Sequence, residues 1–91
     1  MLLKKKWDKA NIQEELRKII ITIMKPHDND EAEKTAEEYF KDIDSLRIME
    51  LVVKTESRFK IEIPTDQLTS LDEKDFYKFS EIVEKELGGI A

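Results

Sequence analysis

The chain has 91 residues and a formal net charge of −5; 40% of its residues are hydrophobic and 41% are charged. This balance excludes a disordered chain, and no apolar run is long enough to span a membrane. Cysteine is absent, which excludes disulfides and cysteine-based metal sites. The acidic balance disfavours nucleic acid and suits basic partner proteins, so we expect one cytoplasmic, monomeric domain over residues 1–91, without membrane insertion.

Helical periodicity predicts a first long helix that begins near Asp8 or Asn11, since either residue can cap it. It should end before Pro26, because the residue before a proline is biased out of the helical conformation. Apolar residues recur at helical spacing along this stretch and define one buried face. They are Ile12, Leu16, Ile19, Ile20 and Ile23.

The connection that follows, residues 25–43, is long for a link between two helices. We expect a short helical turn within residues 30–40, with Tyr39 and Phe40 anchoring it to the core.

A second long helix is predicted over residues 45–59, followed by a loop with one short helix after Pro64. A last helix should span residues 74–87 and stop at Gly88 and Gly89. Its inward-facing residues are predicted to be Phe76, Phe79, Ile82, Val83 and Leu87. The sequence therefore predicts an all-α fold, a small bundle of three main helices plus one short helix.

The second long helix carries two apolar faces when its residues are projected at about 100° per residue. The predicted core face consists of Ile48, Leu51, Val52, Thr55 and Phe59. Leu46, Met49 and Val53 fall on roughly the opposite side, and a surface helix of a small bundle can bury only one face. We therefore expect these three residues to form an exposed apolar strip. Glu50 and Glu56 flank the strip, and a basic edge between the two faces consists of Arg47, Lys54 and Arg58.

Ser45 stands at the predicted start of this helix, directly after Asp44. Either residue is a favoured helix cap, and capping alone would account for both. A nucleophilic serine would need a base, and the only histidine, His27, lies in a polar loop with nothing to orient it. A serine at a helix N-terminus is also well placed to bear a phosphate group, because the helix dipole and free N–H groups favour an anion.

The stretches DSLRIMELV and FKIEIP, from Asp44 to Pro64, resemble the acyl carrier proteins. In that family an Asp-Ser-Leu motif opens the second helix of a small helical bundle, and the predicted helices match this layout over nearly the whole chain. The motif here continues at fixed distances with Glu50, Phe59, Glu62, Ile63 and Pro64.

The resemblance implies that 4′-phosphopantetheine is attached covalently to the hydroxyl of Ser45 by a phosphopantetheinyl transferase. It implies that Asp44 helps this transferase to dock. It also implies that partner enzymes, which transfer or synthesise acyl groups, dock on the exposed strip and its neighbouring acid. These docking residues are Leu46, Met49, Glu50 and Val53.

Two features depart from the family pattern. Asp42 stands where the family often has glycine, and the basic edge dilutes the acidic character of the second helix. The resemblance implies a freestanding acyl carrier protein, not an enzyme, that presents acyl thioesters to partner enzymes. Because the charge of the second helix differs, we expect it to serve a specialised lipid or polyketide-type pathway. An aminoacyl or peptidyl carrier is the alternative within the family. A helical adaptor that is never modified is the alternative from another class.

Overall fold

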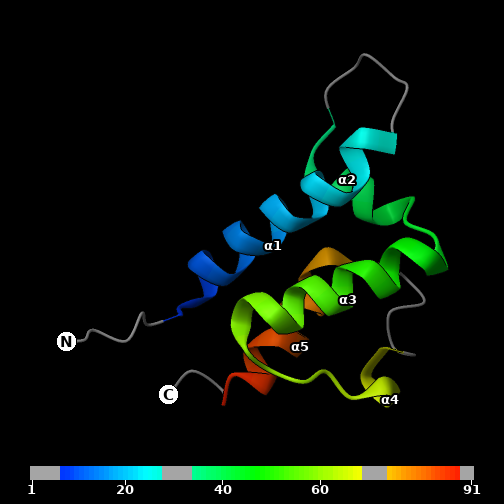
Figure 1. Cartoon of the computed structure of the whole chain (residues 1–91). Helices are drawn as coiled ribbons and strands as arrows, with labels where there is room; N and C mark the ends of the chain where they lie inside the picture. The colour runs from blue at the N-terminus through cyan, green and yellow to red at the C-terminus, as the bar shows by residue number, and fades with distance from the viewer. Residues whose placement is uncertain (1–6, 28–33, 69–73, 89–91) are drawn as a thin grey trace.

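Five α-helices and one short 3-10 helix make up the described part of the chain, residues 7–27, 34–68 and 74–88 of this computed structural model (Figure 1). The three long helices are α1 (Lys9–Met24), α3 (Ser45–Phe59) and α5 (Phe76–Glu86). The short helices are α2 (Ala36–Lys41), α4 (Thr65–Leu68) and the 3-10 helix Lys25–His27. No strand occurs within these residues, so the predicted all-α fold is confirmed.

Each long helix begins after an aspartate whose carboxylate accepts a hydrogen bond from a backbone N–H in the first turn. These N-caps are Asp8, Asp44 and Asp75. Such caps satisfy donors that have no partner inside the helix, and each is worth about 1 kcal/mol. A capping box between Thr35 and Glu38 starts α2, which is therefore a helix in its own right and longer than the single turn expected there.

The ends of the helices also have local causes. Helix α1 stops at Met24, before Pro26, as predicted. Lys60 ends α3 in the left-handed conformation, with φ of 58°. Gly88 follows α5 with φ of 92°, a conformation that favours glycine, whereas Gly89 lies outside the described residues. Lys74 also has a positive φ, 52°, so α5 begins at Phe76, two residues after the predicted start.

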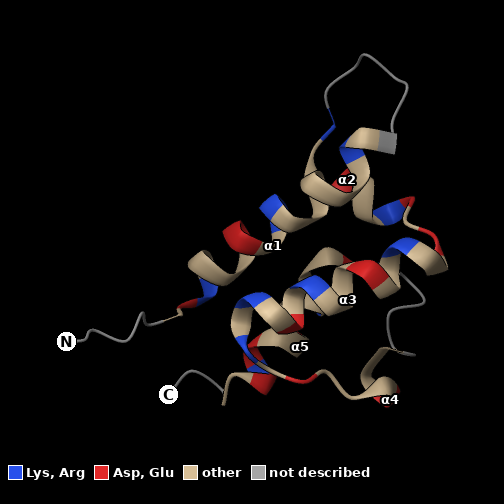
Figure 2. Cartoon of the chain, viewed as in Figure 1, with Lys and Arg blue, Asp and Glu red and all other residues tan. Residues whose placement is uncertain are grey.

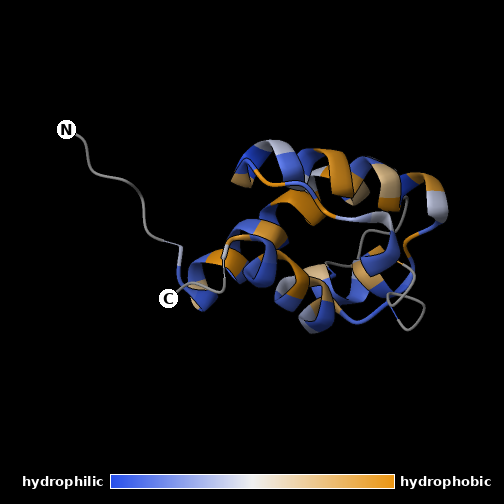
Figure 3. Cartoon of the chain, turned by 90° about the horizontal axis from the view of Figure 1, so that it is seen from below, coloured by the Kyte–Doolittle hydropathy of each residue, from blue (hydrophilic) through white to orange (hydrophobic). Residues whose placement is uncertain are grey.

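The core lies where α1 packs against α2, α3 and α5. Its fully buried members include Ile12, Leu16, Ile20, Phe40, Leu51, Phe79 and Val83. Tyr39 and Phe40 are both buried, so the predicted aromatic anchor of the connection is confirmed. Ile19, Ile48 and Leu87, which were expected to face the core, are only partly buried at its rim. Hydrophobic segments recur along the long helices and are interrupted by hydrophilic ones (Figure 3).

One polar cluster links α1, α2 and α5 at the edge of this core. The Arg17 guanidinium donates to Glu37 Oε2 through Nε at 3.2 Å and through a terminal nitrogen at 3.1 Å. The Tyr77 hydroxyl donates to the same oxygen at 3.3 Å. The hydrogen bond to Glu37 raises the pKa of Arg17. Burial opposes the charged form of Glu37, but its hydrogen bonds to backbone and to Arg17 outweigh burial and lower its pKa.

The fold leaves α3 with one covered face and one uncovered face, because α1 packs on one side of it (Figure 1). A search of the described helices finds none with the length and apolar character needed to cross a membrane.

Candidate functional site

Ser45 is the first residue of α3 and is exposed. The capping role belongs to Asp44, whose Oδ1 accepts the Arg47 backbone N–H at 2.8 Å. The Asp44 carbonyl also accepts the Ile48 N–H at 2.9 Å, which closes the first turn. The position of the helix start is thus fixed by Asp44, and the Ser45 hydroxyl lies on the surface at the positive end of the helix dipole.

The apolar strip is exposed as predicted. Leu46 is 68% exposed, Met49 58% and Val53 60%. The other side of the helix is buried through Leu51, Val52, Thr55 and Phe59. The helical projection therefore assigned the exposed strip and four of the five core-face residues correctly, whereas Ile48 is only partly buried. Ser45 begins the same helix that presents the strip.

A shallow hollow of about 450 Å³ runs along this exposed face. Its lining residues are Leu46, Arg47, Met49, Glu50, Val53 and Lys54. All six belong to α3, so the hollow is an open surface between side chains and not an enclosed cavity. The structure places Glu50 beside the strip, as the sequence predicted. It also places Arg47 and Lys54 of the basic edge there, but not Arg58.

Glu56 does not act as a free carboxylate on the other flank of the strip. Its Oε2 accepts the backbone N–H of Ile63 at 2.8 Å. This hydrogen bond holds the loop after α3 against the helix, where Ile63 is buried. No sequence pattern indicates this role of Glu56, because its partner is a backbone group in a loop.

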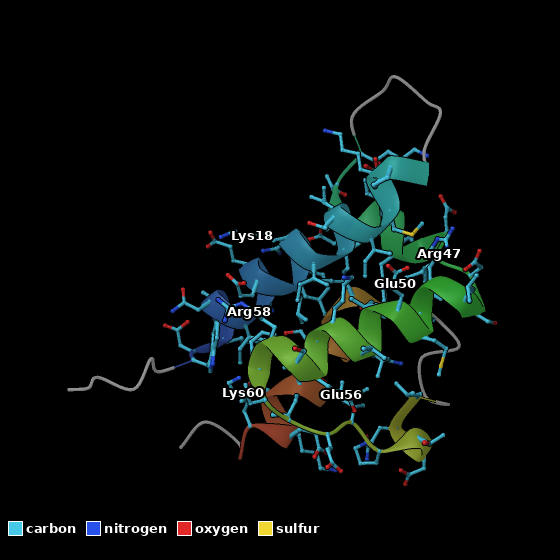
Figure 4. All side chains as sticks on the ribbon, viewed as in Figure 1. Lys18, Arg47, Glu50, Glu56, Arg58 and Lys60 are labelled. Atoms are coloured by element: carbon cyan, nitrogen blue, oxygen red, sulfur yellow. The ribbon has the colours of Figure 1, made fainter. Side chains whose placement is uncertain are left out.

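Arg58 turns away from the strip and toward α1 (Figure 4). Its Nε donates to Glu15 Oε1 at 2.8 Å, and its guanidinium lies 5.1 Å from the centre of the Trp7 ring. The basic edge is therefore divided: Arg58 joins α3 to α1, whereas Arg47 and Lys54 line the hollow. Figure 2 shows basic and acidic residues alternating along α3.

The surroundings of Ser45 suit a covalently attached phosphate ester. The side chain is exposed, so a modifying enzyme can reach it, and the start of a 15-residue helix favours a negative charge. The described residues contain no group of three His, Asp or Glu side chains that could hold a metal ion. The arrangement places the exposed Ser45 hydroxyl at the start of the helix that carries the apolar strip.

Comparisons of the chain with models of protein families, with curated proteins and with solved structures find no match. The functional interpretation therefore depends on the residues and geometry of this chain. Three observations carry it: an exposed serine at a helix start, a separate residue that caps that helix, and an apolar strip on the same helix.

Proposed function

We propose that this protein is a freestanding acyl carrier protein that bears 4′-phosphopantetheine on Ser45. The observation that carries the proposal is the position of Ser45, exposed at the start of α3, which also presents an exposed apolar strip. The Asp-Ser-Leu motif at this point, and the Glu-Ile-Pro sequence that follows the helix, add the family resemblance.

Attachment needs only a hydroxyl from this chain. The Ser45 oxygen would form a bond to the phosphorus of coenzyme A that carries the pantetheine arm. The bond from this phosphorus to the oxygen bridging the diphosphate breaks, and adenosine 3′,5′-bisphosphate leaves. The proton of the hydroxyl passes to a base of the transferase. When attached, phosphopantetheine supplies a terminal thiol on a flexible arm, and this thiol holds an acyl group as a thioester.

The residues around Ser45 have separate tasks in this proposal. Asp44 fixes the helix start through its hydrogen bond to the Arg47 N–H, so the serine is presented in one backbone conformation. Leu46, Met49 and Val53 offer apolar contact area to the transferase and then to partner enzymes. A tethered cargo reaches each docked active site at a high effective concentration.

The charge pattern of α3 favours a specialised lipid or polyketide-type pathway. Arg47 and Lys54 line the docking hollow beside Glu50, so a partner selected only for basic residues would meet like charges there. An aminoacyl or peptidyl carrier would use the same arm with different cargo. An unmodified adaptor would use the strip alone, and modification of Ser45 separates it from both carriers.

The test is to incubate the purified protein with coenzyme A and broad-specificity phosphopantetheinyl transferases and to measure the intact mass. We expect a gain of one phosphopantetheine per chain. A wild-type protein that stays unmodified with several such transferases would contradict the proposal.

A further inference from the structure

The exposed strip has the spacing of a helix-packing seam. Leu46, Met49 and Val53 are three and then four positions apart on α3, the alternation that coiled-coil core positions use. From Leu46 to Val53 the strip is about 10 Å long, or about two turns, at 1.5 Å per residue. A strip of this shape fits the apolar face of a second helix laid along it.

One edge of the strip carries three charged side chains at the same spacing. Arg47, Glu50 and Lys54 all line the hollow and are again three and four positions apart. The order of charge along this edge is positive, negative, positive, and we refer to these three residues as the alternating edge. On the opposite flank Glu56 is bound to the Ile63 N–H, so its carboxylate is held toward the loop.

We propose that the apolar strip binds an amphipathic helix of a partner protein whose edge carries carboxylate, cation and carboxylate in that order. Opposite charges at matched spacing favour this partner, and a uniformly basic partner would place like charges against Arg47 and Lys54. The required order reads the same from either end, so it holds for parallel and antiparallel helices. The inference names the partner chemistry of the docking surface and rests on the proposed function for its biological meaning.

This partner differs from the one that the whole-chain charge would select. The net charge of −5 favours basic ligands at long range. In contact, however, neighbouring charges dominate, because salt screens exposed charges beyond a Debye length of about 8 Å at physiological ionic strength. Two peptides that differ only in their charged edge can therefore separate selection by the net charge from selection by the alternating edge.

The experiment uses two synthetic helical peptides with the same leucine-rich apolar face. One has the edge Glu, Lys, Glu and the other has Lys at all three positions. Each is titrated into the isotopically labelled Ser45→Ala protein and followed by NMR, so that the result does not depend on modification of the serine. We expect the first peptide to bind about two- to tenfold more tightly, as two exposed ion pairs would allow, with shifts centred on Leu46, Met49 and Val53.

Two variants make the test decisive. The double variant Arg47→Glu, Lys54→Glu should reverse the preference, because its edge is then wholly acidic. Met49→Glu should weaken binding of both peptides, and far-UV circular dichroism checks that each variant is folded. Equal or tighter binding of the all-lysine peptide to the protein with the native edge would overturn the proposal. So would the absence of binding by both peptides, or binding that Met49→Glu does not affect.

Discussion

The Glu56 carboxylate accepts the backbone N–H of Ile63 at 2.8 Å and so fastens the loop after α3 back onto that helix. Lys60 makes the turn possible by adopting a left-handed conformation directly after the helix. With the loop fastened, Ile63 is buried, while the apolar strip on α3 stays exposed. The helix that carries the proposed docking surface thus also holds this loop in place.

Replacement of Glu56 by alanine should destabilise the fold by about 1–3 kcal/mol, since a partly buried N–H loses a charged acceptor. Glu50→Ala is a matched control on the same helix, where an exposed glutamate should change stability by no more than about 0.5 kcal/mol. Urea denaturation of both variants measures the difference. Equal midpoints would mean that the loop does not depend on Glu56.

The two faces of α3 should respond differently to substitution. Leu51→Ala removes a buried side chain and should cost about 2–5 kcal/mol. Met49→Glu changes an exposed side chain and should cost no more than about 0.5 kcal/mol, while it slows modification by the transferase. Thermal melts of the two variants test both expected losses of stability. A large loss for Met49→Glu would show that the faces are assigned wrongly.

The Arg17–Glu37–Tyr77 cluster should make stability depend on pH. The pKa of Glu37 is lowered in the folded protein, so its ionised form stabilises the fold above the ordinary glutamate pKa. This contribution is lost as the pH falls through the lowered value, because the protonated carboxyl no longer pairs with Arg17. Glu37→Gln should therefore be less stable than wild type at neutral pH and closer to it in acid.

Urea midpoints for wild type and Glu37→Gln at neutral pH and below the glutamate range provide the measurement. The side chains of Arg17 and Glu37 are 37% and 30% exposed, so solvent screening keeps the effect small. A difference between the two proteins that is the same at both pH values would contradict this account of the pair.

The charge of the docking surface should exclude enzymes of general fatty acid synthesis. We expect the modified protein to be a poor substrate for them, because Arg47 and Lys54 lie in the hollow that such basic partners would contact. Arg47→Glu combined with Lys54→Glu should improve elongation, and more strongly at low salt. Arg58 is left unchanged, because its guanidinium pairs with Glu15 on α1.

An elongation assay at two ionic strengths compares wild type, the double variant and a general acyl carrier protein. If wild type and the general carrier are elongated equally well, the basic residues do not select partners and the specialised-pathway interpretation loses its main support.

The parts of the structure that depend on nearby residues were predictable from the sequence. The bounds of α3, its two faces and the Asp8 cap follow from helical spacing and from cap preferences within a few positions. The start of α5 was misplaced, because the left-handed conformation of Lys74 is not encoded in any periodic pattern.

Contacts between distant parts of the chain were not predictable in the same way. Arg58 and Glu15 are 43 positions apart, and Tyr77 and Glu37 are 40 apart. A helical projection places Arg58 on the correct edge of α3, but it cannot show that α1 brings a carboxylate to it. For this reason the basic edge was predicted as one feature and is divided in the structure.

The central claim is that Ser45 carries phosphopantetheine, and the most direct measurement is the intact mass of Ser45→Ala and Ser57→Ala after treatment with the same transferase and coenzyme A. Ser57 is an exposed serine on the same helix, so it controls for loss of a hydroxyl from α3. We expect Ser57→Ala to gain one phosphopantetheine and Ser45→Ala to gain none while remaining helical. A gain by Ser45→Ala, or no gain by Ser57→Ala and wild type, would contradict the account.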